Sequence, residues 1–234
     1  PDLFGPGEDK KEFMIFDYCQ NFEFFDENPD GATAKNMKPL LQQIFEAKLK
    51  VSQLITHLSE KTPTEVEVRD AYLTELHKTV QNLDENRFVV RKELRHVKEF
   101  SNKSKWLDLS KSDVQEINTH LSNLQPASKE DDELARRFDM LVLIYQILLL
   151  TGSGDTGKYM GKIYRTAAAL EKKDNIPQVF LHLPLIKEVQ TDHYWETVDI
   201  KKLENLRLAL RDLIKYLETQ KQEPIYTHFE DDLD

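Results

Sequence analysis

The sequence contains one cysteine and only 7 glycines and 9 prolines among its 234 residues. The lone Cys19 excludes an internal disulfide bond and a metal site made of several cysteines, which suits a reducing compartment. The shortage of glycine and proline favours long stretches of regular structure. The longest apolar run, from Met140 to Leu150, is interrupted by Gln146 and is too short to cross a bilayer. We therefore expect a soluble cytoplasmic protein with no membrane partner.

Acidic residues outnumber basic ones, with 42 Asp and Glu against 32 Lys and Arg and a formal net charge of −10 at pH 7. Such a chain as a whole repels nucleic acid, so any contact with phosphate requires a local basic patch. The length is sufficient for one large domain or two small ones with a proper hydrophobic core.

Apolar residues recur every three or four positions along most of the chain, which is the period of an amphipathic helix. Thr62, Ser110 and Asp199 mark helix starts because their side chains cap free backbone N–H groups. The expected helices cover residues 39–58, 63–86, 88–100, 110–124, 128–151, 159–173 and 199–218. The helix over 128–151 is apolar nearly all round in its second half, so we expect it at the buried centre of a helical domain.

The ends of the chain have a different pattern. Residues 13–16 and 225–229 are strand-like, and we expect them to lie in one small sheet. Five leucines from Leu203 to Leu217 alternate at three and four residues, which favours an internal helix contact over an intermolecular coiled coil. We find no internal repeat. The predicted fold is mainly α: a helical bundle domain with short β-strands near the N- and C-termini.

A nucleotide-binding loop is suggested by the spacing of Gly152, Gly157 and Lys158. That loop requires a preceding strand and a Ser or Thr after the Lys to hold magnesium. Here a long helix is expected before it, and Tyr159 follows the lysine. We interpret the segment as a connector between two helices.

Two further patterns also lack the context that their chemistry needs. The first half of a calcium loop is present, but Met37 stands where the closing glutamate should be. A nuclease-like pattern lies in a turn rich in Pro and Gly, whereas its metal site would need two adjacent strands. The residues of these patterns are Asp26, Asn28, Asp30 and Gly31 for calcium, and Pro1, Asp2, Glu8 and Lys10 for the nuclease.

The seven histidines include no pair at the i, i+4 spacing that places two imidazoles on one helix face. No Ser, His and Asp can be assembled into a triad from the sequence. We therefore assign no catalytic residue, no metal site and no cofactor to this chain, and expect no enzymatic activity from it alone.

A basic segment interrupts the acidic background. Between residues 86 and 111, eight Lys or Arg stand against three acids. On a helix, Arg87, Arg91, Arg95 and Lys98 would form one stripe that could bind DNA or an acidic partner, although an ordinary solvated face with Glu–Arg pairs is the alternative. The candidate DNA- or partner-binding residues are Arg87, Arg91, Lys92, Arg95, Lys98, Lys103 and Lys105.

The opening residues, PDLFGPGEDKKEFMIFDYCQNFEFF, resemble the segment that follows the last helicase motif in the restriction (R) subunit of type I restriction-modification enzymes. Further segments look like the helical C-terminal region of R subunits related to the EcoEI and EcoKI type. They are NRFVVRKELRHVKEF, RRFDMLVLIYQILLL, QTDHYWETVDIKKLENLRLALRDLIKYLE and PIYTHFEDDL. The tail around Tyr226 to Asp231 and the strand near Asp17 are the more specific of these, and the helical middle is generic.

The resemblance implies that residues 1–34 are the remnant of a second RecA-like helicase lobe and residues 35–234 a helical C-terminal domain ending in a short strand. It further implies that this domain attaches the motor and nuclease subunit to the methyltransferase core, with the modification and specificity subunits as partners. Duplex DNA, contacted through residues 87–105, is the alternative partner. The parent would be an ATP-dependent site-specific deoxyribonuclease, and its need for ATP and Mg²⁺ would belong to parts outside this chain.

Overall fold

A computed structural model describes residues 38–125 and 133–220, and within these ranges the chain is mainly helical. None of the helices described there is both long enough and apolar enough to span a membrane. The strands expected at 13–16 and 225–229 and the domain boundary after residue 34 lie outside these ranges. The elements are α2 (Leu40–Thr56), α3 (Pro63–Gln81), α4 (Phe88–Lys92), α5 (Leu94–Phe100), η2 (Lys103–Leu107), α6 (Lys111–His120), α7 (Glu133–Thr151), α8 (Thr156–Glu171), α9 (Pro177–Leu181), α10 (Leu183–Glu188), α11 (Asp192–Glu196), α12 (Ile200–Leu210) and η3 (Arg211–Gln220).

The predicted helix caps are confirmed. The Thr62 side chain accepts a hydrogen bond from the Glu65 N–H, and the Glu65 carboxylate accepts one from the Thr62 N–H in return. Asp199 accepts from the Lys202 N–H at 2.7 Å. Ser110 forms the same reciprocal box with Asp113 at the start of α6. Each cap satisfies N–H groups that the first helical turn leaves without partners.

Replacing Ser110 by alanine is expected to lower the free energy of unfolding by about 1 kcal/mol at neutral pH. The hydrogen bond from Ser110 depresses the pKa of Asp113. The stabilisation that this bond gives is therefore present above the unfolded-state pKa of Asp113, and it is lost as the pH falls through the folded-state pKa of Asp113. The difference between S110A and the parent should therefore narrow in acid. Urea unfolding at several pH values measures it, and a difference that stays constant down to strongly acidic pH would contradict this assignment.

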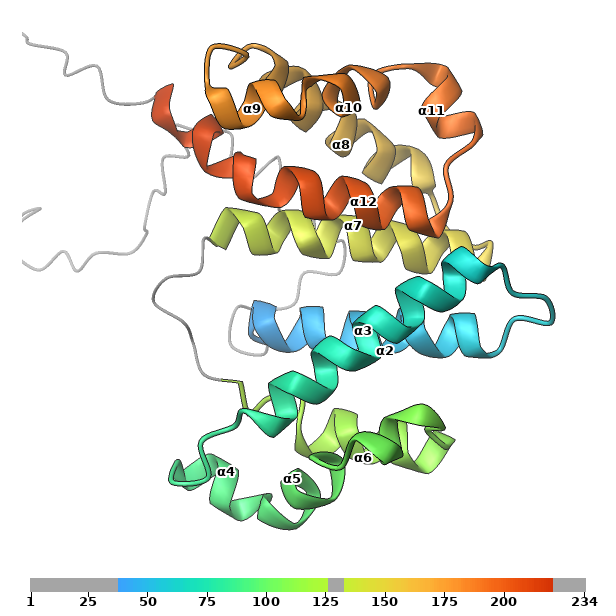
Figure 1. The fold of residues 1–234 in the computed structure, drawn as a ribbon, viewed down its shortest axis with the longest axis vertical. Coiled ribbons are helices and arrows are strands. Elements are labelled where there is room, and N and C mark those ends of the chain that lie inside the picture. The colour runs from blue at the N-terminus through green and yellow to red at the C-terminus, as the bar shows by residue number, and fades with distance from the viewer. Residues whose placement is uncertain (1–37, 126–132, 221–234) are drawn as a thin grey trace, which may run out of the picture.

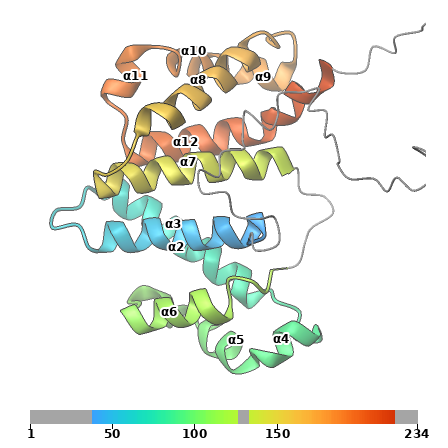
Figure 2. The same ribbon diagram turned by 180° about the vertical axis from the view of Figure 1, so that it is seen from behind.

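The helices form layers along the long axis of the molecule (Figures 1 and 2). Helices α4 to α6 lie at one end, α2 and α3 come next, α7 and α12 follow, and α8 to α11 lie at the other end. Helix α7 packs on α2, α8, α12 and η3, so the expectation that it forms the buried centre is confirmed.

Three apolar clusters hold these layers together. One joins α7 to α8–α12 and η3, a second joins α2 and α3 to α4–α6, and a third lies between α2, α3 and α7. Leu203, Leu206, Leu210 and Leu213 are buried in the first of them. The leucine seam is therefore an internal helix contact, as expected.

The second half of the described chain repeats the element order of the first half, which corrects the sequence analysis. Two long helices are followed by a five-residue helix, a bend, a second short helix, one further short helical segment and a capped helix. The counterparts are α2 and α7, α3 and α8, α4 and α9, α5 and α10, η2 and α11, and α6 and α12. Matched elements begin at Phe88 and Pro177, at Lys103 and Asp192, and at Lys111 and Ile200, with the same separation in each pair. We call residues 40–124 the first repeat and residues 133–213 the second repeat.

Equivalent side chains make equivalent contacts in the two repeats. The indole N–H of Trp106 donates to the Phe100 carbonyl at 2.7 Å, and that of Trp195 donates to the Val189 carbonyl at 2.8 Å. Buried core positions also correspond: Val90 with Val179, Val97 with Ile186, Ile117 with Leu206, and Leu121 with Leu210. The matching bonds and core positions show that both halves have the same local architecture.

The helix expected over residues 88–100 is divided in two at Glu93. The Glu93 N–H bonds to the Val90 carbonyl three residues back, which tightens the turn and bends the chain. In a straight helix the side chains of Val90 and Phe100 would point about 80° apart. The bend allows both side chains to enter the apolar cluster that joins α2 and α3 to α4–α6, where they are fully buried. Neither Gly nor Pro marks the bend.

Candidate functional site

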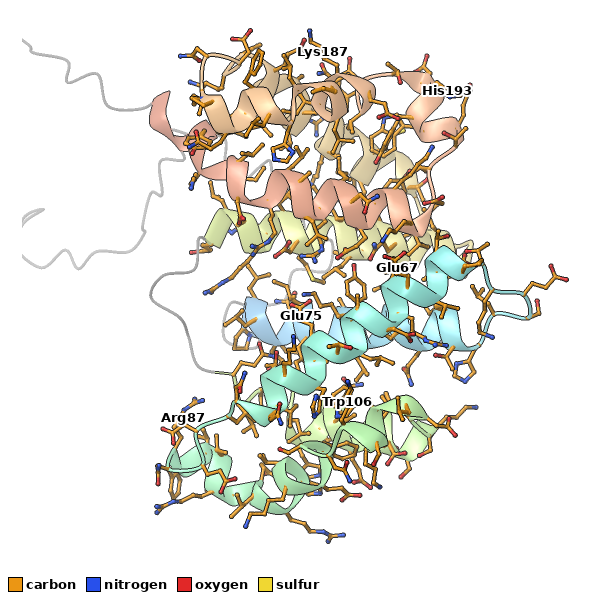
Figure 3. The ribbon with its side chains drawn as sticks, viewed as in Figure 1. Glu67, Glu75, Arg87, Trp106, Lys187 and His193 are labelled. Carbon is orange, nitrogen blue, oxygen red and sulfur yellow. The ribbon has the colours of Figure 1, made fainter. Side chains whose placement is uncertain are left out.

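Two of the predicted basic side chains, those of Arg87 and Lys105, form contacts within the first repeat. Arg87 is half-buried and donates to the carbonyl of Leu124 at 2.6 Å, which ties the start of α4 to the end of the first repeat. Lys105 forms an ion pair with Glu99 at 2.8 Å and lies 3.9 Å from Asp113. Arg87 is labelled beside α4 in Figure 3.

The other five predicted residues, which are Arg91, Lys92, Arg95, Lys98 and Lys103, are exposed. Among the described residues, no ion pair is recorded for any of them. The bend at Glu93 places Arg91 and Lys92 on α4 and Arg95 and Lys98 on α5, so these residues do not lie on one continuous helix as expected. Their role in binding DNA or a partner stays a prediction.

Exposed apolar side chains accompany these cations. Phe88 is 70% exposed and Val89 45% exposed. The Lys92 ammonium lies 4.6 Å from the centre of the Phe88 ring, a cation–π distance. We call Phe88, Val89, Arg91 and Lys92 the α4 surface.

The equivalent helix of the second repeat also exposes apolar side chains. Phe180 and Leu181, which occupy the positions of Arg91 and Lys92, are 62% and 76% exposed. We call this pair the α9 surface. Helices α4 and α9 lie at opposite ends of the molecule (Figures 1 and 2). The two repeats thus present two separate surfaces in which apolar residues face solvent.

A buried polar network joins the two repeats between these ends. The guanidinium of Arg207 on α12 donates to both carboxylate oxygens of Glu204 at 2.8 Å and to Asp139 on α7 at 2.7 Å. The hydroxyl of Tyr72 on α3 donates to Glu204, and it also lies 2.9 Å from the Gln146 side-chain oxygen. The network therefore connects α3 of the first repeat with α7 and α12 of the second.

Burial and neighbouring charges together shift the pKa values in this region. Burial would lower the pKa of Arg207, but the hydrogen bonds and charges of Glu204 and Asp139 outweigh it and raise that pKa above its ordinary value. Burial raises the pKa of Tyr72, and the Glu204 charge raises it further. Burial lowers the pKa of Lys48 on α2 despite its ion pair with Glu75. Arg207 thus stays charged in the interior, beside the carboxyl groups of Glu204 and Asp139.

The first part of the segment with the spacing of a nucleotide loop, residues 152–155, connects α7 to α8, as expected, whereas Gly157 and Lys158 lie in the first turn of α8. Gly152 and Gly154 have φ of 62° and 97°, in the left-handed region that glycine favours. Asp155 caps α8 by accepting from the Gly157 N–H at 2.9 Å. The four residues of the calcium pattern and the four of the nuclease pattern lie outside the described residues.

Sequence reasoning did not identify Phe88, Val89, Phe180 and Leu181 as surface residues. In an amphipathic pattern they are indistinguishable from core residues. An alignment of the two repeats could have distinguished these surface residues from core residues, because Val90 and Val179 are the matched buried positions near them.

We compared the chain with protein-family models, curated proteins and solved structures, and none of them matches it.

Proposed function

We propose that this chain is a binding module: the helical C-terminal domain of a type I restriction subunit, which attaches the motor and nuclease to the methyltransferase core. The observation that carries the binding role is the pair of α4 and α9 surfaces, because equivalent short helices at both ends of the molecule expose apolar side chains. The choice of family and partner rests on the sequence resemblance. In this proposal the module acts in the cytoplasm, and ATP and Mg²⁺ serve the motor of the parent protein.

The chemistry of the α4 surface suits a protein partner. Aromatic and arginine side chains are enriched at protein interfaces and supply much of the binding energy when they become desolvated. Phe88 offers a large apolar area, while Arg91 and Lys92 can pair with carboxylates at the rim. The partner surface should accordingly be apolar with acidic neighbours.

Binding of the chain to the assembled modification and specificity subunits tests the proposal. Phe88→Ala and Arg91→Glu are each expected to weaken binding at least about tenfold, the range of an interface hot spot. For the α4 surface, Leu208→Ala and Lys187→Glu are matched controls, since Leu208 is 56% exposed on α12 and Lys187 is exposed at the opposite end of the molecule from α4. The double variant F180A/L181A tests the α9 surface in the same way. Unchanged affinity in all variants of both surfaces would overturn the proposal.

Contact with duplex DNA is the second candidate function, favoured by the exposure of Arg91, Lys92, Arg95, Lys98 and Lys103. Phosphate binding would release counterions, so affinity should fall steeply with salt concentration. A gel shift with a salt titration measures this, and replacing Arg91 and Arg95 by Glu should reduce both affinity and the salt slope. The net charge of −10 opposes the idea, and absence of a shift at low salt would exclude it.

A further inference from the structure

A carboxylate and two imidazoles meet in the first repeat where α6 ends against the bend between α4 and α5. The Glu93 Oε2 atom lies 2.9 Å from Nδ1 of His120 and 3.4 Å from Nδ1 of His96. The two imidazole rings stack with centroids 3.9 Å apart and planes within 5° of each other. One ligand atom from each of the three residues can be chosen so that all lie within 4.8 Å of one another.

One nitrogen of this cluster lacks a hydrogen-bond partner. Nδ1 of His96 is buried and has no hydrogen-bond partner among the described residues. Its distance from Glu93 is within ion-pair range but does not give a hydrogen bond. A buried ring nitrogen without a hydrogen-bond partner destabilises the folded state, unless another species binds its lone pair or accepts a hydrogen bond from its N–H.

The second repeat shows that the fold does not need these polar residues. The positions of Glu93, His96 and His120 are taken there by His182, Leu185 and Ala209. Leu185 and Ala209 pack against the apolar core of that repeat. The bend itself is the same in both, with φ, ψ of −106°, 16° at Glu93 and −103°, 5° at His182. The Glu and His side chains are thus an addition to a framework that folds without them.

We propose that Glu93, His96 and His120 bind one divalent transition-metal ion, with Zn²⁺ as the best match. Two histidines and one glutamate are an established zinc donor set, with water in the remaining position. Ligand atoms about 2.0–2.1 Å from a tetrahedral Zn²⁺ lie roughly 3.3 Å apart. The two oxygen–nitrogen separations, 2.9 and 3.4 Å, bracket that value.

Binding requires one local adjustment. The parallel rings must tilt toward each other so that both Nδ1 lone pairs converge on the ion. Side-chain exposures of 30% for Glu93, 19% for His96 and 33% for His120 leave room for the tilt, for entry of the ion and for a water ligand. The bound ion would fasten the end of α6 to the α4–α5 bend and so fix the helix that carries the α4 surface.

Titration of the complete chain with Zn²⁺, and with Co²⁺ followed by its visible absorption, tests the site. We expect one Zn²⁺ per chain at this site, a rise in Tm on addition of Zn²⁺, and Co²⁺ absorption typical of nitrogen and oxygen ligands. His96→Ala and His120→Ala should each weaken affinity at least about 100-fold, and Glu93→Gln at least about tenfold, since even supporting residues around a metal contribute 10–100-fold.

His193→Ala and His228→Ala are the controls for adventitious binding. His193 lies on α11 near the opposite end of the molecule (Figure 3), and His228 precedes an acidic run in the sequence. Both variants should retain wild-type affinity. Where His120→Ala loses the helical circular dichroism of the parent, His120→Asn takes its place. Absence of Zn²⁺ uptake, or uptake that survives the His96 and His120 substitutions, would overturn the proposal.

Discussion

Replacing Arg207 by methionine is expected to lower the free energy of unfolding by about 3–5 kcal/mol. The substitution keeps much of the apolar stem of the side chain but removes the only cation that pairs directly with Glu204 within the described part of the chain. The carboxyl groups of Glu204 and Asp139 would then remain in the interior without this partner, with side chains only 7% and 6% exposed. Their desolvation would no longer be offset by the guanidinium, although Arg211 still lies 3.1 Å from Asp139.

Urea unfolding of R207M and of Lys187→Met separates this effect from loss of a surface charge. Lys187 is exposed on α10, so its replacement should change stability by less than about 0.5 kcal/mol. The double variant E204L/R207M should be more stable than R207M, because an apolar pair avoids the buried unpaired charge. A loss below 1 kcal/mol for R207M would show that the network contributes little to holding the repeats together.

The long helices could be predicted from the sequence because their signals are local. Thr62 with Glu65, Ser110 with Asp113, and Asp199 each place a cap directly before an apolar period. Short helices lack such periods. Helices α9, α10 and α11 have only five or six residues each, and we did not expect them because their helical geometry depends on packing against α8 and its neighbours.

The internal repeat escaped prediction for a related reason. Its matched residues are separated by unrelated surface positions, so a match such as Trp106 with Trp195 becomes meaningful only when the two hydrogen bonds are seen together. The Glu93–His96–His120 cluster could not be found along the chain either. His120 approaches the other two only because α6 packs against α5. The mainly helical fold and the central position of α7 could thus be predicted, whereas the surfaces and the cluster depend on tertiary contacts.

Replacing Trp106 by alanine should lower the free energy of unfolding by about 3–5 kcal/mol, the range for deleting a buried large aromatic side chain. Trp106 is 3% exposed and packs edge-on to Phe100 and His77, with ring centroids 6.4 and 6.1 Å away. Its loss would leave both a cavity and the Phe100 carbonyl without its indole donor. Leu107→Ala is the matched control, because the neighbouring Leu107 is 80% exposed and should change stability by less than about 0.5 kcal/mol.

The two tryptophans also report whether the repeats unfold together. Since they are the only ones in the chain, W195F leaves fluorescence from the first repeat and W106F leaves it from the second. The shared core between α2, α3 and α7 and the network around Arg207 should couple the repeats. In each single-tryptophan variant, the fluorescence and circular dichroism transitions in urea should therefore coincide. A fluorescence transition of Trp106 that clearly precedes or follows the loss of helix in the same variant would mean that the repeats unfold as separate units. The contacts between the repeats would then be weaker than the burial of their residues implies.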